Sequence, residues 1–254
     1  MSRLRRPRRA TEAGWESQSV GGAAIMSDQA DSSAVAAAAR PGARARSIDP
    51  QAAVRILAHR DPQLGALIRR IGPFHPRATP DPFNALLGSI LHQQISMRAA
   101  AAVQRKLRDL CGGQRFQPEA ILQLSTAKLR SAGLSRQKTT YVRDLAEHFA
   151  SGRLSARRLR QTDDEAVIEA VTQVKGVGRW TAEMLLIFCL RRPDVWPIDD
   201  YGLRKAAGNF LRLGGLPDAE TMRMIGNPWR PFRTVACWYL WRSLENPITP
   251  GISL

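Results

Sequence analysis

The chain has 254 residues, of which 44% are hydrophobic and 24% charged, and its formal net charge is +16 at pH 7. This composition allows one sizeable core or two small ones, and no apolar run approaches the roughly 20 residues that span a bilayer. So large a surplus of Lys and Arg attracts polyanions, which makes nucleic acid the first expected partner and a membrane surface the second.

The first part of the chain is rich in Ala, Arg, Ser, Gly and Pro. It lacks the apolar content that offsets chain entropy, so we predict that residues 1–47 form a disordered basic tail without essential function. Three alternatives stay open, namely a transit peptide, an additional DNA-binding arm, and a true translation start at Met26.

From residue 48 onward, apolar residues recur at the three- and four-residue spacing of amphipathic helices. The pattern runs through "AVRILAHRDPQLGALIRRIG", "DPFNALLGSILHQQISMRAAAAVQRKLRDLC" and "SRQKTTYVRDLAEHFASG". The period-two alternation of strands is missing. The sequence therefore predicts an all-α fold.

Residues 162–190 read as a helix, a short "KGVG" hairpin and a second helix. The free N–H groups and the dipole at the start of the second helix suit a phosphate, which Gly176 and Gly178 would allow to approach closely. Lys175 and Arg179 add positive charge on either side. The alternative is that the two glycines only make a tight corner between helices.

Four blocks of the chain resemble a known family. "VKGVGRWTA", followed after a helix by "VWPIDDYGLRKA", is similar to the helix-hairpin-helix and Gly/Pro-Asp signature of the DNA glycosylase superfamily, in particular its 3-methyladenine glycosylase II (alkylbase) branch. "LLGSILHQQISMRAAA" and "NPWRPFRTVACWYLWRSL" resemble its wedge region and its tryptophan-rich C-terminal helix. The resemblance implies a glycosylase domain over 48–254, with a central lobe of about 85–198, a second lobe of 48–84 plus 199–254, and a cleft between the lobes.

The resemblance places the catalytic aspartate at Asp200, with Asp199 as its neighbour at the helix start. When an N-glycosidic bond breaks, positive charge develops on the sugar, and a fixed carboxylate stabilises that charge or orients the attacking water. The alternative for both aspartates is a helix cap, a common use of Asp after Pro.

Base flipping needs a side chain that fills the vacated stack and a pocket that receives the base. The family's wedge falls on Gln94, with Gln93 as the close alternative, and a merely polar helix end is the other interpretation. Trp180 matches the family position that faces the substrate, and Tyr201 is expected to contact it as well. For the other aromatic side chains near the C-terminus core packing is preferred; these are Trp229, Trp238, Tyr239 and Trp241.

The resemblance also implies contacts with the DNA backbone and with a monovalent ion. The expected backbone contacts are Lys175, Gly176, Gly178, Arg179 and Thr181. No cofactor is required, but a structural Na⁺ or K⁺ is expected in the hairpin, held by the backbone carbonyls of Thr172, Val174 and Val177. The three cysteines are too few for the four-cysteine iron–sulfur cluster of some relatives, so no such cluster is expected.

The expected function is that of a monofunctional DNA glycosylase that excises alkylated purines from double-stranded DNA, as a cytoplasmic, nucleoid-associated monomer without a membrane partner. Stacking on Trp180 would favour purines that carry the positive charge of alkylation. Lyase-active relatives have their nucleophilic lysine where this chain has Trp180. The alternatives are a glycosylase for uracil or another deaminated base, and a non-catalytic helix-hairpin-helix protein that only binds DNA.

Overall fold

The computed structural model describes residues 49–113 and 115–245, so the predicted tail of residues 1–47 lies outside the described part of the chain. Over the described ranges the fold is all-α without a strand, as predicted. No helix in these ranges is long and apolar enough to cross a membrane. The helices are α2 (Pro50–Arg60), α3 (Pro62–Ile71), α4 (Pro82–His92), α5 (Met97–Leu110), α6 (Pro118–Gln123), α7 (Thr126–Ser131), α8 (Arg136–Ala150), α9 (Ala156–Gln161), α10 (Asp164–Thr172), α11 (Arg179–Phe188), α12 (Tyr201–Leu211), α13 (Ala219–Gly226), the 3₁₀ turn η1 (Asn227–Trp229) and α14 (Arg233–Glu245).

Asp-Pro pairs start the first three helices of this series. In each pair the aspartate carboxylate accepts a hydrogen bond from a backbone N–H of the first turn, and the proline occupies a position that needs no N–H donor. Asp61 accepts from the amide of Leu64 at 2.9 Å. This cap divides the single apolar stretch of the sequence into α2 and α3.

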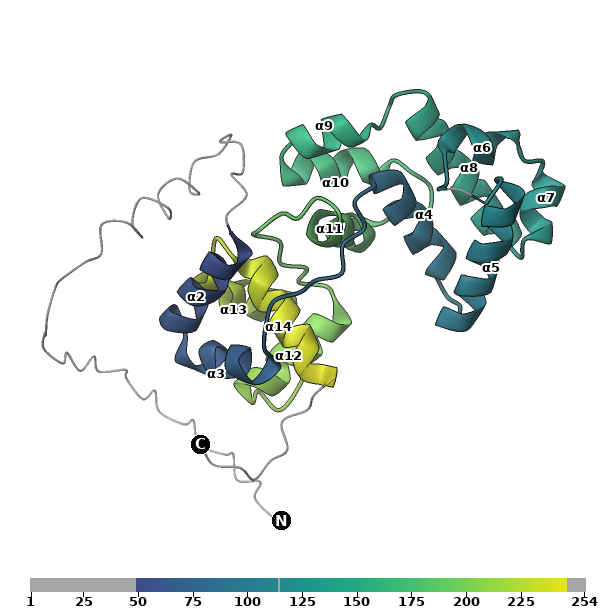
Figure 1. The fold of residues 1–254 in the computed structure, drawn as a ribbon. Coiled ribbons are helices and arrows are strands. Elements are labelled where there is room, and N and C mark those ends of the chain that lie inside the picture. Colours follow the sequence, from purple (N-terminus) through teal and green to yellow (C-terminus); the bar gives the residue numbers. More distant parts are fainter. Residues whose placement is uncertain (1–48, 114, 246–254) are drawn as a thin grey trace, which may run out of the picture.

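The helices form two lobes (Figure 1). The buried side chains form two hydrophobic clusters, one in each lobe. The first cluster draws on residues 83–195, and the second on residues 53–74 together with 196–240. Trp241 packs against both clusters. In Figure 1, α11 lies between the helices of the first lobe and the pair α12 and α14 of the second. The start of α12 is therefore close to the junction of the lobes, while the predicted lobe boundaries near 84 and 198 stay predictions.

Candidate active site

Asp200 is the N-cap of α12. Its Oδ1 accepts a hydrogen bond from the backbone N–H of Leu203 at 2.5 Å, and its own N–H donates to the carbonyl of Pro197 at 3.0 Å. Asp199 is exposed and is not the cap. Of the two aspartates for which a cap was considered, Asp200 is thus the one that caps α12, while its catalytic role stays a prediction.

Two tryptophans from different lobes hold the Asp200 carboxylate. The indole Nε1 of Trp180 on α11 donates to Oδ2 at 2.7 Å, and that of Trp241 on α14 donates to Oδ1 at 2.8 Å. With the amide of Leu203, three N–H groups converge on one carboxylate, which is an acceptor when ionised. These contacts fix the orientation of the carboxylate relative to both lobes.

All four C-terminal aromatics have the packing role expected of them, because each belongs to a hydrophobic cluster or packs against one. Trp229 and Tyr239 are buried, and each donates its polar hydrogen inside the second lobe, to Asp61 and to the carbonyl of Gly72. Trp241 has a second role beside packing, since its ring stacks on Phe188 with centroids 5.9 Å apart while its N–H binds Asp200. The requirement that a half-buried indole N–H finds an acceptor is the signal that could have indicated this role.

Replacing Trp241 by Phe should slow base release roughly tenfold, because one hydrogen bond to a charged group, worth about 1.5 kcal/mol, is lost while the ring is kept. DNA affinity should not change. Single-turnover base release is the measurement, and Trp238→Phe is the matched control, since Trp238 lies on the same helix and packs on Phe74 instead. Equal rates for the two variants would contradict a positioning role of Trp241.

Two large aromatic side chains beside Asp200 are open to solvent. Trp180 is 49% exposed although its N–H is bound, and Tyr201, the first residue of α12, is 64% exposed. Exposed aromatic surface of this size next to a fixed carboxylate can stack on a ligand base. The structure thus brings Trp180, Asp200 and Tyr201 together.

The two glutamines after α4 differ in their contacts. Gln93 donates its Nε2 hydrogen to the carbonyl of Gly176 at 2.8 Å, so its amide supports the hairpin. Gln94 is exposed, and its φ of 57° is in the left-handed region that non-glycine residues rarely adopt. Of the pair, Gln94 is the side chain free to enter a DNA stack.

The hairpin between α10 and α11 depends on its first glycine. Gly176 has φ 80°, and a Cβ atom there would lie 2.1 Å from the ring of Tyr141. Gly178, the N-cap of α11, has no heavy atom within 4 Å of an added Cβ, and no side chain caps the helix among the described residues. Gly176 is thus required by the fold, whereas Gly178 leaves open space in front of the helix N-terminus.

The other predicted backbone contacts are partly engaged within the protein. Lys175 donates its amide to Asp144 at 2.8 Å, and its Nζ lies 3.7 Å from the same carboxylate. The Arg179 guanidinium binds Glu165 through two hydrogen bonds and Glu183 through Nε at 3.2 Å. The Thr181 side chain is buried, which leaves its backbone N–H as the group that could meet a phosphate.

Glu183 is a buried carboxyl group one turn after Trp180. Burial raises the pKa of Glu183 to about 7, and the neighbouring Arg179 guanidinium only partly opposes this effect. The ionised form is therefore disfavoured in the folded protein relative to the unfolded chain.

This shift predicts a pH dependence of stability. Because the folded pKa lies above the ordinary value of 4.5, the stabilisation by Glu183 is complete at lower pH and is lost as pH rises through about 7. Glu183→Gln cannot ionise and should avoid this loss. The free energy of unfolding of the wild type should therefore fall by roughly 2 kcal/mol more than that of Glu183→Gln between acidic pH and a pH above 7. Urea unfolding over a pH series measures it, with the exposed Glu169→Gln as control; parallel curves for Glu183→Gln and wild type would contradict it.

The expected monovalent cation stays a prediction. The carbonyl of Val174 accepts from the N–H of Val177 at 3.0 Å within the hairpin turn, which leaves it one further lone pair for an ion. A carbonyl ligand set with Thr172 and Val177 would suit Na⁺ or K⁺. Among the described residues no group of three or more His, Cys, Asp or Glu side chains could hold a metal ion.

A hollow of about 300 Å³ lies between α4 and α11. Ser89, Met184 and Phe188 are among its lining residues, and Thr79 lines it as well. Phe188 stacks on Trp241, which binds Asp200. The hollow is thus separated from the carboxylate by two aromatic side chains.

Comparison with known proteins places this architecture in a family. Residues 87–231 match the model of the HhH-GPD superfamily of base excision DNA repair proteins. The chain belongs to this superfamily. The matched range of this HhH-GPD protein includes the hairpin and Asp200 but ends before Trp241.

Individual relatives give the same result. The chain is 32% identical over 194 residues to DNA-3-methyladenine glycosylase 1 of Schizosaccharomyces pombe. This match covers 72% of this chain and 85% of the relative. The crystal structure of a DNA-3-methyladenine glycosidase from Bacillus halodurans is similar with a TM-score of 0.70 at 37% identity, over 75% of this chain and 88% of that one. The 3-methyladenine DNA glycosylase of Schizosaccharomyces pombe, solved in complex with abasic DNA, has a TM-score of 0.69 at 32% identity and covers 76% of this chain and 97% of its own.

Proposed function

We propose that this protein is a monofunctional DNA-3-methyladenine glycosylase that removes alkylated purines from double-stranded DNA in base excision repair. The observation that carries the proposal is Asp200, held by Leu203, Trp180 and Trp241 at the junction of two lobes beside an exposed aromatic surface. A protein that only gripped phosphates would need neither a fixed carboxylate nor open aromatic rings at this place.

The chemistry follows from the charge of Asp200. As the bond between C1′ and the base nitrogen breaks, its electron pair leaves with the base, and the sugar gains oxocarbenium character that the carboxylate stabilises. Water adds to C1′ and loses a proton. A purine alkylated at N3 or N7 is cationic and departs as a neutral molecule, so the leaving base needs no proton from the protein.

Selection of the base and of the duplex uses the neighbouring groups. The exposed face of Trp180 attracts a cationic ring through its quadrupole, which favours alkylated over normal purines. The amides at the start of α11 and the open space at Gly178 suit a phosphate beside the flipped nucleotide, with Gln94 in the vacated stack. We further propose that the protein acts as a monomer in the cytoplasm, where chromosomal DNA is its substrate.

The test is to incubate the protein with duplexes that each carry one defined lesion and to identify the released base. Free 3-methyladenine is expected. Release of uracil alone would overturn the alkylpurine assignment. Binding without release of any base would refute the glycosylase activity and indicate a protein that only binds DNA.

Strand cleavage should require added alkali after base release. A Schiff base needs a nucleophilic amine at the sugar, but the site next to Asp200 holds the indole of Trp180, and the Lys175 ammonium lies beside Asp144. Denaturing electrophoresis should therefore show intact strands until alkali is added. A covalent protein–DNA adduct trapped with borohydride would contradict this prediction.

A further inference from the structure

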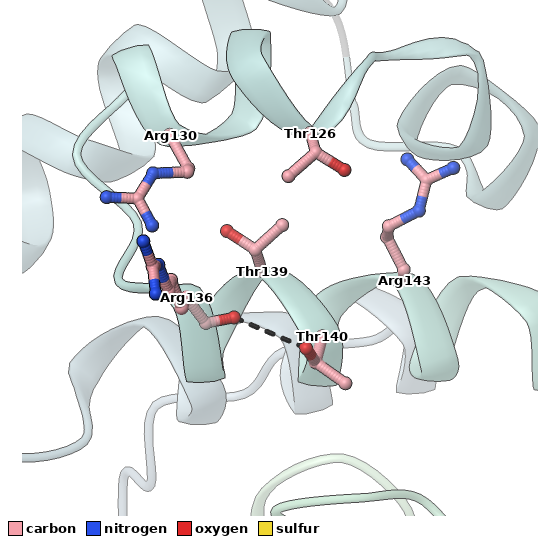
Figure 2. A pocket seen from close by; sticks show the side chains of 6 residues that line it. All are labelled: Thr126, Arg130, Arg136, Thr139, Thr140 and Arg143. Atoms are coloured by element: carbon pink, nitrogen blue, oxygen red, sulfur yellow. Dashed lines mark hydrogen bonds between the residues drawn. The ribbon is translucent and has the colours of Figure 1, made fainter.

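A second hollow, of about 490 Å³, lies between α7 and the first half of α8. Figure 2 shows Thr126 facing Thr139 across it, with Arg130 and Arg136 gathered at one end and Arg143 at the other. Thr140 completes the lining, which contains no carboxylate. Helix α7 lies at the far end of the first lobe from α12 (Figure 1), so this hollow is separate from the site at Asp200.

The three arginines of this hollow have no carboxylate partner among the described residues. Arg143 donates one Nη1 hydrogen to the carbonyl of Leu124 at 2.7 Å, which orients its guanidinium and leaves its other donors free. Arg130 and Arg136 are exposed and turn toward each other in Figure 2. Like charges so arranged repel until an anion lies between them.

The donors around the hollow match one kind of anion. Guanidinium groups present planar pairs of N–H donors that fit phosphate oxygens. The hydroxyls of Thr139 and Thr140 donate to the carbonyls of Ser135 and Arg136, so of the three lining threonines Thr126 is the one whose hydroxyl can donate to a phosphate. The chemistry is therefore that of a phosphate group.

Helix α8 connects this hollow with the predicted DNA-binding elements. Beyond its first turn, Tyr141 packs against Gly176 of the hairpin and Asp144 binds the amide of Lys175. On the same helix, Lys138 donates to the carbonyl of Leu91, just before the turn that carries Gln94. The hairpin and the Gln94 turn thus contact one face of α8, while the lining residues of the hollow project from another face toward α7. A duplex bound at the hairpin reaches the hollow by passing over the exposed start of α8.

We propose that the hollow between α7 and α8 is a second phosphate-binding site, which holds the backbone of the same duplex outside the nucleotides gripped by the hairpin. The proposal rests on the DNA binding of the proposed function. The site adds affinity and salt dependence, while base selection and bond cleavage stay with Trp180 and Asp200.

The test compares two double variants that each remove two positive charges. Arg130→Gln with Arg136→Gln empties one end of the hollow, and Arg69→Gln with Arg223→Gln removes exposed arginines of the second lobe as the matched control. Affinity for a duplex with an abasic-site analogue is measured by anisotropy over a salt series. The hollow variant should bind several-fold more weakly, and its slope of log affinity against log salt should be smaller by about 1, since the two arginines share one phosphate and each phosphate contact contributes roughly 0.9. Single-turnover base release at saturating protein should equal that of the wild type.

A further variant keeps all arginines and adds a negative charge. Thr140→Glu should weaken DNA binding in the same way, because Thr140 is exposed and its carboxylate would repel a phosphate in the hollow. If wild type binds DNA and releases base while the hollow variants match the control, the second site is refuted and the proposed function stands. Binding of free pyrophosphate, measured by calorimetry, tests a small anion as the occupant. If the hollow variants keep the DNA affinity of the wild type but lose pyrophosphate binding, the hollow is a site for a small anion and the proposal is refuted. A wild type that binds no duplex would overturn both proposals.

Discussion

Asp200→Asn should lower the rate of single-turnover base release by about a hundredfold to a thousandfold, equivalent to roughly 3 to 4 kcal/mol of transition-state stabilisation. The amide oxygen can still accept from Leu203 and Trp241, so the cap of α12 is kept. The amide NH₂ replaces Oδ2 and meets the N–H donor of Trp180. The variant therefore loses the charge and one of the three hydrogen bonds, while the fold remains.

Binding measured beside the rate separates catalysis from affinity. DNA affinity of Asp200→Asn should be unchanged or higher, since a carboxylate near phosphates repels them. Asp199→Asn is the matched control, because Asp199 is exposed and caps no helix among the described residues, and its rate should equal that of the wild type. An active Asp200→Asn with an inactive Asp199→Asn would move the catalytic assignment by one residue. Two active variants would refute the mechanism.

The sequence indicated the hairpin and the aspartate because both depend on short segments. Both features can be recognised from a few neighbouring residues. The hairpin has a glycine with positive φ between two helices, and the aspartate is followed directly by an apolar helix. The pattern did not decide which of two adjacent aspartates caps α12, since either could begin the first turn. The hydrogen bond from Leu203 to Asp200 decides it.

Contacts between distant segments could not be predicted in this way. Trp241 lies 41 residues after Asp200, and Gln93 lies 83 residues before its partner Gly176. Helical spacing assigned Trp241 to a packed face and could not show that α14 brings its indole N–H to the start of α12. Likewise, Gln93 and Gln94 are equivalent at a helix end until the packing of the hairpin engages one of them.

The second large effect is expected on stability, at the first glycine of the hairpin. Gly176→Ala should destabilise the protein by about 3 kcal/mol, because a left-handed backbone costs a side-chain-bearing residue roughly 1 to 2 kcal/mol and an overpacked contact about as much again. The overpacked contact is with Tyr141, whose ring lies 2.1 Å from the added Cβ. DNA affinity should fall as well, since the hairpin must move. Urea unfolding measures the loss, and adding Tyr141→Ala should recover the steric part but not the backbone part.

Gly178→Ala distinguishes a phosphate grip from a merely tight corner. The backbone at Gly178 has φ −101° and ψ 176°, which any residue adopts, and an added Cβ has no heavy atom within 4 Å. Its free energy of unfolding should therefore stay within about 0.5 kcal/mol of the wild type. If a DNA phosphate approaches the amides at the start of α11, the new methyl group occupies its space, and affinity for undamaged duplex DNA should fall several-fold. Anisotropy beside urea unfolding tests both statements. A Gly178→Ala variant with unchanged stability and unchanged affinity would refute the phosphate contact at Gly178 and leave the hairpin with the structural role of Gly176 alone.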